Sequence, residues 1–560
     1  MSVASTSYAA AREAGRTIDR LLERPRAVLG GLIVAQIGAT LVLALTVMHN
    51  GWVYFQGGDQ IVNTTTAWLI GGLEIPPTEV GYVWPLVLAP ITWVTGATFV
   101  QALPAIVLLN VLILGPIALF CVYSIADHIG GRLLGYWAAA LWVVAPYAAI
   151  PLFVDRYHEK WVDQFLPQAL GLTAMPDFPS LVLVLAAALF VVRSLSPDRV
   201  HDALLAGLLA GAAGGLKPPN YLFVFGAVLA YPLARRWREA VAFGIALAPS
   251  ILLLAFWKER GLGYIPALAL EQVQLAAGSA PLALDLNLDK YVDLDLEHWR
   301  VQMDELREFF WSPRLAQFVP FAGLLAVLRM RRYAIAGLLA GWLAAFLVVK
   351  GFSPRASIEA NTFWRLLMPA WPAYLLLFAS IPLLVPTLAR RLGDRVQAPR
   401  RGPVDRRWLV VAAVATLAVP VTVTAAAARI EPPTPAFVQP TESDTTILTP
   451  VDEGIELQVE REGASQRLSW TPGSWRAGVF YRVYRKDGPG EDTQCALSEG
   501  VAWSCFLLST PIATTRETTF VDPSPPPDGA TYRIGVGTNW ADDPELGDVF
   551  DFSPPVPAAR

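Results

Sequence analysis

Residues 27–49 read AVLGGLIVAQIGATLVLALTVMH, an apolar run without any Asp, Glu, Lys or Arg. A helix needs about 20 consecutive apolar residues to cross a bilayer. This run is too long for the core of a cleavable signal peptide, and no A-x-A site follows it. The preceding residues 1–26 are polar and rich in arginine. We therefore expect an uncleaved first membrane span with residues 1–26 in the cytoplasm.

Similar apolar runs recur along the chain. Hydrophobic residues make up 54% of the 560 residues and charged residues only 16%, whereas a soluble protein carries about 25% charged residues. The sequence therefore predicts a multi-span α-helical membrane protein. The net charge of −4, without a basic patch interleaved with aromatic residues, gives no indication of nucleic-acid binding.

Arginine-rich clusters separate the apolar runs and indicate their orientation. Positive residues favour the cytoplasmic side of a membrane, so every cluster should lie inside. If the runs at 81–99 and 103–126 both crossed, Arg132 and all later clusters would lie outside. We therefore interpret 81–99, which contains Pro85 and Pro90, as a re-entrant or interface-lying helix. About eleven transmembrane helices remain, at 27–49, 103–126, 133–152, 179–195, 202–216, 219–234, 240–257, 315–329, 333–350, 363–387 and 408–429.

The segments expected outside hold most of the acids and tryptophans that precede the C-terminal region. A transporter more often places its ionisable groups within the spans, so this distribution favours chemistry at the outer surface. We expect a membrane domain at 27–429 with its main outer loops at 50–102, 153–178 and 258–314. The last of these loops is acidic and amphipathic, and it is expected to be a mobile lid on the bilayer.

The chain changes character after residue 429. A proline-rich linker at 430–449 precedes residues 450–545, where β-rich stretches alternate with Gly, Pro and Asp turns. These stretches are GIELQVE, QRLSWT, VFYRVYR, TTFVD and TYRIGVG, and their spacing predicts an extracytoplasmic β-sandwich of about 100 residues. Cys495 and Cys505 are close enough in sequence to form a disulfide, which indicates an oxidising side of the membrane.

This C-terminal region resembles a fibronectin type III module. Trp470 in LSW would be the core tryptophan, FYRVYR at 480–485 the third strand, and Tyr532 in ATYRIGV the corner tyrosine. Such a module can serve as a spacer or as a recognition surface without chemistry of its own.

The first outer loop contains one prominent carboxylate, Asp59, in GWVYFQGGDQIVNTTTAWLIGG. Amides, hydroxyls and aromatic rings surround it in sequence, among them Tyr54 and Gln60. A carboxylate just outside a span is often only a solvated loop residue. A loop with an embedded helix, aromatic walls and amide side chains also fits a pocket for a sugar.

The second outer loop carries a mixed set of charges, including His158, Asp163 and Asp177. Such a set is typical of a hydrated amphipathic segment on the membrane surface. Asp177 differs because it lies between two prolines at the head of the next span, where it can cap the helix and also face a pocket. His158 and Glu159 have no third ligand at metal-site spacing, so we predict no zinc site.

Three cations lie in or beside the expected outer segments. Lys217 in GGLKPPN can extend to the interface or pair with an anionic headgroup or diphosphate. Arg355 lies in the short outer loop at 351–362, and Arg365 begins a span on the outer side, against the positive-inside bias. Because a guanidinium binds phosphate oxygens in a fork, Arg365 is a candidate phosphate ligand.

The order of these parts resembles the polytopic glycosyltransferases of the GT-C superfamily. The resemblance covers about 1–390 and is carried by an early outer acid followed by YVWPL, HIGGRLLGYWAAALWVVAP, PDFPSLVLVLAAALFVVRSL, GLLAGAAGGLKP and FWRLLMPAWPAYLLL. Enzymes of this family typically have paired acids in the first outer loop, whereas this chain has Asp59 followed by Gln60. That departure weakens any metal-binding role, and leaves open whether a divalent cation takes part.

The resemblance implies an inverting hexosyl or pentosyl transfer from a polyprenyl-phosphate sugar to an envelope glycan, lipid or protein. Asp59 would be the catalytic base, and the membrane would be a bacterial plasma membrane. The donor or substrate ligands would be Tyr54, Gln60, His158, Asp163, Asp177, Lys217, Arg355 and Arg365. The alternatives from other classes are a membrane transporter and a scaffold that binds the cell wall through the β-sandwich.

Overall fold

The computed structural model describes most of the membrane domain and the strands of the C-terminal region. The described residues are 24–46, 58–75, 80–95, 99–149, 165–262, 294–309, 314–353, 362–393, 402–429, 437–440, 446–449, 455–471, 479–487, 511–538, 548–554 and 556–559.

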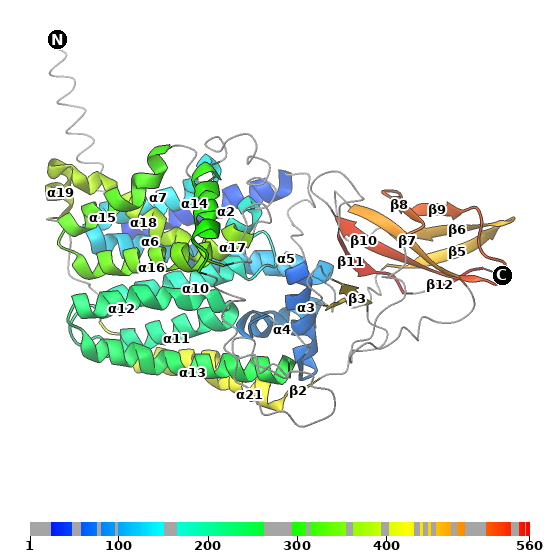
Figure 1. Cartoon of the computed structure of the whole chain (residues 1–560), viewed down its shortest axis with the longest axis horizontal. Helices are drawn as coiled ribbons and strands as arrows, with labels where there is room; N and C mark the ends of the chain where they lie inside the picture. The colour runs from blue at the N-terminus through cyan, green and yellow to red at the C-terminus, as the bar shows by residue number, and fades with distance from the viewer. Residues whose placement is uncertain are drawn as a thin grey trace, which may run out of the picture.

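Helices dominate the chain as far as residue 426 (Figure 1). In chain order they are α2 (Pro25–Thr46), α3 (Gly58–Gly71), α4 (Val83–Thr95), α5 (Phe99–Leu109), α6 (Gly115–Gly130), α7 (Arg132–Ala149), α9 (Leu166–Ala169), α10 (Asp177–Ser194), α11 (Val200–Leu216), α12 (Phe223–Leu233), α13 (Trp237–Leu262), α14 (Leu296–Phe309), α15 (Val319–Arg329), α16 (Tyr333–Gly351), α17 (Thr362–Leu367), α18 (Trp371–Ser380), α19 (Pro386–Gly393), α20 (Arg406–Ala413) and α21 (Val419–Ala426). Short π or 3-10 segments extend or join them: η1 (Asn110–Leu114), η4 (Pro218–Leu222), η6 (Arg314–Phe318), η7 (Met368–Ala370), η8 (Ile381–Leu384) and η9 (Val414–Ala418).

Each predicted span contains helix in the structure, with ends that differ by several residues. In the described part of the chain, seven helices are long and apolar enough to cross a membrane, and three shorter apolar helices accompany them. The prediction of a multi-span helical membrane protein is therefore confirmed.

Helix α10 forms the centre of the bundle. Its span is 83% buried, whereas the spans of α2 and of α20–α21 are 11% and 17% buried. It packs against α6, α11 and η7, and α11 packs in turn against α13. An apolar helix with few buried side chains suits the lipid-facing edge of a bundle, as in α2 and α20–α21. A helix that is buried on all sides, such as α10, lies at the centre.

The segment interpreted as re-entrant contains α4, a helix of 13 residues. At 1.5 Å per residue such a helix is roughly 20 Å long, and the hydrocarbon core of a bilayer is about 30 Å thick. Helix α4 is therefore too short to cross a bilayer alone. It packs against α3, α5 and α11.

Two strands connect the first outer loop with the chain that leaves the last span. Strand β1 (Glu74–Ile75) pairs in parallel with β2 (Ala428–Arg429), which directly follows α21. The segments after α3 and after α21 therefore lie on the same side of the bundle. Two further strands, β3 (Phe437–Pro440) and β4 (Thr446–Thr449), pair within the predicted linker, and β4 packs against α3.

The C-terminal strands form two antiparallel sheets beside the helical bundle, on the side of α3 and α5 (Figure 1). One sheet contains β5 (Leu457–Glu462), β6 (Ser465–Trp470) and β9 (Thr519–Asp522). The other contains β8 (Ala513–Thr515), β7 (Val479–Asp487), β10 (Ala530–Thr538) and β11 (Asp548–Phe552), with β12 (Val556–Pro557) paired to β10. The five predicted strands are confirmed, but the region extends beyond the predicted end at 545.

Buried aromatic side chains join the two sheets. The Trp470 ring on β6 lies 5.4 Å from the Tyr481 ring on β7, centroid to centroid. The Tyr532 hydroxyl donates to Asp522 Oδ2 at 2.7 Å, and Arg485 Nη1 donates to the same oxygen at 3.0 Å. These contacts fit the predicted roles of Trp470 and Tyr532 as core residues, while the identity of the region as a fibronectin type III module stays a prediction.

The described part of the large outer loop packs against the bundle. The Trp299 ring of α14 stacks on Phe352 with centroids 5.9 Å apart, and His298 Nε2 contacts the Ser353 carbonyl at 3.1 Å. A Cβ on Gly351 would lie 2.5 Å from Trp299 Cδ1, so only glycine allows this approach. Whether the loop acts as a lid stays a prediction, but α14 itself is attached to the end of α16.

Candidate functional site

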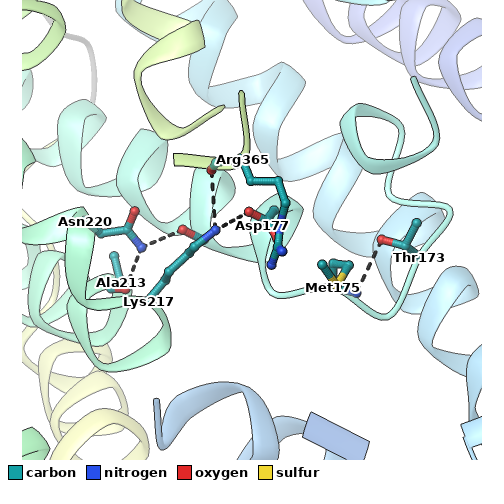
Figure 2. A network of polar contacts seen from close by, with 8 residues as sticks. Thr173, Met175, Asp177, Ala213, Lys217, Asn220 and Arg365 are labelled. Carbon is teal, nitrogen blue, oxygen red and sulfur yellow. Dashed lines mark hydrogen bonds and ion pairs between the residues drawn. The ribbon is translucent and has the colours of Figure 1, made fainter. Parts of the chain in front are cut away.

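Asp177 is the first residue of α10, and its side chain is fully buried. The sequence allowed it to cap the helix, but the N-cap position is Pro176 and no side chain caps this end. The carboxylate faces two cations instead. Lys217 Nζ donates to Oδ1, and Arg365 Nε lies 3.5 Å from Oδ2 (Figure 2). Asp177 does not cap the helix as the sequence allowed, because it is already the first helical residue, one position after the N-cap.

Three segments that are far apart in sequence bring these charges together. Lys217 ends α11 in an extended conformation, and Arg365 lies in α17. Lys217 Nζ also contacts the Arg365 carbonyl oxygen at 3.4 Å. The Lys217 and Arg365 side chains keep 14% and 20% of their exposure, whereas Asp177 has none. The cluster is thus a buried acid that faces two partly accessible cations.

Asn220 fixes the turn that carries Lys217. Its Nδ2 donates to Ser180 Oγ at 2.5 Å and to the Ala213 carbonyl at 2.7 Å (Figure 2). Ser180 lies in the first turn of α10 and Ala213 in the last turn of α11. One buried amide therefore holds η4, α10 and α11 together beside the ion pairs.

The first outer loop attaches to the segment just before Asp177. Gln60 Oε1 accepts a hydrogen bond from the Ala174 N–H at 2.7 Å, and Trp84 Nε1 donates to the Ala174 carbonyl at 2.8 Å. Both polar backbone atoms of Ala174 are thus held by side chains of α3 and α4. Asp59 precedes Gln60 in α3, so the backbone of the predicted base lies in the helix that contacts the Asp177 segment.

The opposite edge of that segment is held by Asn110 of η1. Its Nδ2 donates to the carbonyls of Gly171 and Thr173 at 3.0 and 3.1 Å. Gly171 has a positive φ of 75°, a conformation that glycine adopts without strain. The segment that leads into α10 is therefore held by three side chains, Gln60 and Trp84 from the first outer loop and Asn110 from η1.

The start of α4 also contacts the helix that ends at Lys217. A Cβ on Gly215 would lie 2.4 Å from Tyr82 Cζ, and a Cβ on Gly81 would lie 2.1 Å from the Gly215 carbonyl oxygen. Residues 81–82 therefore lie directly on the last turn of α11. The first outer loop contacts both the Asp177 segment and the Lys217 helix.

The structure brings together Gln60, Asp177, Lys217 and Arg365 from the predicted site. Asp59 is placed by its backbone in α3. The remaining predicted site residues, Tyr54, His158, Asp163 and Arg355, and the predicted disulfide pair Cys495 and Cys505 lie outside the described residues.

The charges around Asp177 do not suit a divalent cation, because two positive side chains already face its carboxylate. Within the described ranges, no group of three His, Cys, Asp or Glu side chains could hold a metal ion.

A pocket lies one helical turn from these charges. It lies between α2, α7, α9, α10 and the η7–α18 segment and is partly open to its surroundings. Leu181 follows Asp177 by one turn of α10, and Met368 comes three residues after Arg365. The lining is mainly apolar and aromatic: Gln36, Thr40, Trp142, Val143, Pro146, Tyr147, Ala169, Leu170, Leu181, Met368 and Trp371.

Three residues near this site were not singled out from the sequence: Trp84, Asn110 and Lys350. Trp84 and Asn110 act on backbone groups about 60 to 90 residues away, and no local pattern marks such partners. Lys350 was detectable, because it ends a span on the expected outer side, where the positive-inside bias disfavours lysine.

No family model matches the chain, and no curated protein matches it. Solved structures with a similar fold include ArnT from Cupriavidus metallidurans bound to undecaprenyl phosphate, with 14% identity, a TM-score of 0.40, and coverage of 65% of this chain and 62% of that chain. They also include the Archaeoglobus fulgidus oligosaccharyltransferase in its apo form, with 13% identity, a TM-score of 0.36, and coverage of 73% and 56%. Oligosaccharyltransferase AglB from the same archaeon, in complex with an inhibitory peptide and a dolichol-phosphate, has 12% identity, a TM-score of 0.38, and coverage of 73% and 56%. The chain thus aligns with less than two thirds of the length of each of these proteins.

Proposed function

We propose that this protein is a membrane glycosyltransferase that transfers a sugar from a polyprenyl-phosphate donor to an envelope acceptor at the outer face of the plasma membrane. The observation that carries the proposal is the cluster of Asp177, Lys217 and Arg365, in which two partly accessible cations face one buried carboxylate. The segment before Asp177 is joined to the helix that contains Asp59. This reaction requires a site that binds the phosphate of the lipid donor and a carboxylate that accepts the proton of the acceptor hydroxyl.

Lys217 and Arg365 would bind the phosphate of the donor. An arginine presents its donors in a planar fork that matches phosphate oxygens, and a lysine supplies a compact positive charge. Asp177 would hold the two cations in position through its own ion pairs. Cations placed before the reaction begins stabilise charge that develops on a departing phosphate without further reorganisation.

Asp59 would act as the general base. In the proposed reaction, an acceptor hydroxyl attacks the anomeric carbon and transfers its proton to the Asp59 carboxylate. The bond between the anomeric carbon and the phosphate oxygen breaks, and its electron pair stays on the phosphate. Attack from the side opposite the phosphate inverts the anomeric configuration.

In the proposed reaction, the first isoprenoid units of the donor would lie against the lining of the pocket between α2, α7 and α10. It is mainly apolar, and it begins one turn from Asp177 on α10. Its polar groups include the Gln36 amide and the Thr40 hydroxyl on α2 and the Tyr147 hydroxyl on α7. A chain held there would leave its phosphate near the cations.

A scaffold that binds the cell wall through the β-region is the second candidate. The two-sheet C-terminal region supports it, since such a fold can recognise a ligand without catalysis. A scaffold needs neither the cation cluster nor the attachment of α3 to the Asp177 segment.

The test uses purified protein in lipid nanodiscs and a panel of polyprenyl-phosphate sugars. We expect the native chain to turn over at least one donor and Asp59→Asn to lose that turnover while keeping donor binding. Turnover by Asp59→Asn equal to that of the native chain would refute Asp59 as base. If the native chain binds no donor in the panel, the scaffold becomes the better description.

A further inference from the structure

Gln60 is a buried amide that directly follows the proposed base. It lies in α3, and its side chain is 0% exposed. Its Oε1 accepts a hydrogen bond from the Ala174 N–H at 2.7 Å. Because an amide nitrogen cannot accept such a bond, the orientation of the amide is fixed. In the part of the chain that the structure describes, Gln60 Nε2 has no hydrogen-bond partner, so the oxygen alone makes the contact with Ala174.

Ala174 is also held from α4. Trp84 is 1% exposed, and its Nε1 donates to the Ala174 carbonyl at 2.8 Å. Helices α3 and α4 pack against each other, so a hydrogen bond on either side of the Ala174 Cα attaches this residue to the helix pair. Breaking either bond would leave a buried backbone group without its partner, which is costly. Ala174 is therefore fixed to the first outer loop.

The connection through Gln60 is short at both of its ends. Adjacent Cα atoms are about 3.8 Å apart, so the backbone of Asp59 lies next to that of Gln60. Asp177 comes three residues after Ala174, a stretch that spans at most about 11 Å even when fully extended. The Asp177 carboxylate faces the two cations of the cluster. One buried hydrogen bond thus joins the helix of the proposed base to the segment that ends in the ion pairs.

We propose that Gln60 is a positioning residue for the transfer, because its bond to the Ala174 N–H sets the distance between Asp59 and the Asp177 cluster. The inference rests on the proposed function, which places the base at Asp59 and the donor phosphate at the cluster. The acceptor hydroxyl and the anomeric carbon must lie between these two groups when the bond to the phosphate breaks. A displacement of about 1 Å can lower the rate of such a step roughly 100-fold.

The experiment measures kcat for sugar transfer and the Kd of the donor for the full chain in nanodiscs. Gln60→Met, which has a similar length but no amide oxygen, should lower kcat roughly 10- to 100-fold. The donor Kd should stay within about threefold of the native value, because the lost contact acts on the transition state and not on donor binding. Lys217 and Arg365, which would bind the phosphate, are held by Asp177 and not by Gln60.

A conservative variant separates positioning from contact with a substrate. Gln60→Glu keeps an oxygen at the same place, and a carboxyl group accepts from the Ala174 N–H in either protonation state. It lacks the amide N–H that a substrate ligand would use. Gln60→Glu should therefore recover most of the native kcat.

The matched control removes a buried hydrogen bond at the other end of α10. The hydroxyls of Ser194, the last residue of α10, and Tyr231 lie 3.0 Å apart, and Tyr231 is 1% exposed. Tyr231→Phe should keep the native kcat. All rates are divided by the number of donor-binding sites, so a smaller folded fraction in one variant does not alter the comparison.

The outcomes separate this inference from the proposed function. A native kcat in Gln60→Met would overturn the role of Gln60 and leave the glycosyltransferase proposal intact. Parallel losses of rate and donor affinity that Gln60→Glu does not recover would make Gln60 a substrate ligand, and so would also overturn the inference. An equal loss in Tyr231→Phe would show that the effect is not specific to α3. If the native chain transfers no sugar, the proposed function fails and the inference fails with it.

Discussion

Asp177 and Asp202 are both fully buried aspartates at helix starts, each paired with two cations. They lie at opposite ends of α10 and α11, which are neighbours in the bundle (Figure 1). Asp202 contacts Arg193 Nη2 at 2.8 Å and Arg199 Nη1 at 3.5 Å, so its cations come from the last turn of α10 and from the N-cap of α11, close to it in sequence. The cations of Asp177 come from two other segments, α11 and α17.

The two clusters also differ in the parts of the chain that contact them. At the Asp202 end, Arg193 Nη2 also donates to the Gly402 carbonyl, and His201 contacts the Val404 carbonyl. These contacts attach the segment before α20 to the bundle. At the Asp177 end, the first outer loop, a pocket and a further cation converge. The Asp202 cluster thus lies at an attachment point, whereas the Asp177 cluster belongs to the proposed binding site.

The largest expected effect is a difference in the rate of sugar transfer between a variant of the Asp177 cluster and a variant of the Asp202 cluster. Arg365→Met should lower sugar transfer roughly 100- to 1,000-fold, because it removes a donor that stabilises charge on the departing phosphate. Arg193→Met, at the Asp202 end, should stay within a few-fold of the native rate per folded molecule. Initial rates in nanodiscs, normalised to the folded fraction, provide the measurement. Equal losses in the two variants would remove the distinction between the clusters.

A second prediction concerns the contact between the first outer loop and α11. Gly215→Ala should destabilise the protein by about 1–3 kcal/mol, because its Cβ would lie 2.4 Å from Tyr82 Cζ. The matched control is Gly244→Ala in α13, where a Cβ would meet nothing within 4 Å. Thermal unfolding in the same detergent compares the two. A Gly215→Ala variant as stable as the control would show that Tyr82 does not rest on α11.

A third prediction tests the attachment of α14 next to Lys350. Gly351→Ala should displace Trp299, since the new Cβ would lie 2.5 Å from Trp299 Cδ1. Amide exchange at residues 296–309 should then become faster, while exchange in α10 stays unchanged. Unchanged protection of residues 296–309 would argue against this packing.

The smallest effect is expected in the β-region and depends on pH. Burial alone would raise the pKa of Asp522, but hydrogen bonds from Tyr532, Arg485 and the Ser524 N–H outweigh it and hold the pKa below its ordinary value of 3.8. Since the folded pKa is the lower one, this stabilisation is fully present above pH 3.8 and is lost as the pH falls through the folded value. Exchange protection of residues 519–538 should therefore drop in acid, and Asp522→Asn should abolish that dependence.

The exposed pair of Glu462 and Arg467 is the control for this prediction. Hydrogen bonds from Arg467 also lower the pKa of Glu462, but the pair is on the surface, where solvent screens it. Glu462→Gln should leave the acid dependence of the β-region as it is in the native chain.

Regular features of the fold were predictable because they depend on local patterns. Each segment predicted as a span from its apolar length contains helix in the structure, and alternation with turn residues located the five predicted strands. Strands β8, β11 and β12 were missed, since β8 and β12 are only three and two residues long and β11 lies beyond the predicted end of the region.

The site was only partly predictable. Polar residues on the expected outer side identified Asp177, Lys217 and Arg365, and the structure brings them together. Asp177 does not cap α10 because it lies one position after the N-cap. Its partners Lys217 and Arg365 are distant in sequence, and the local sequence contains no information about such contacts. The roles of Gln60 and Trp84 as ligands of the Ala174 backbone depend in the same way on distant contacts.

The most direct test of the central claim is equilibrium binding of a polyprenyl phosphate to the native chain, Arg365→Gln and Arg193→Gln in nanodiscs. The account predicts that Arg365→Gln weakens binding roughly tenfold or more and that Arg193→Gln does not change it. Equal affinity of all three proteins for the lipid would contradict the assignment of the Asp177 cluster as the phosphate site.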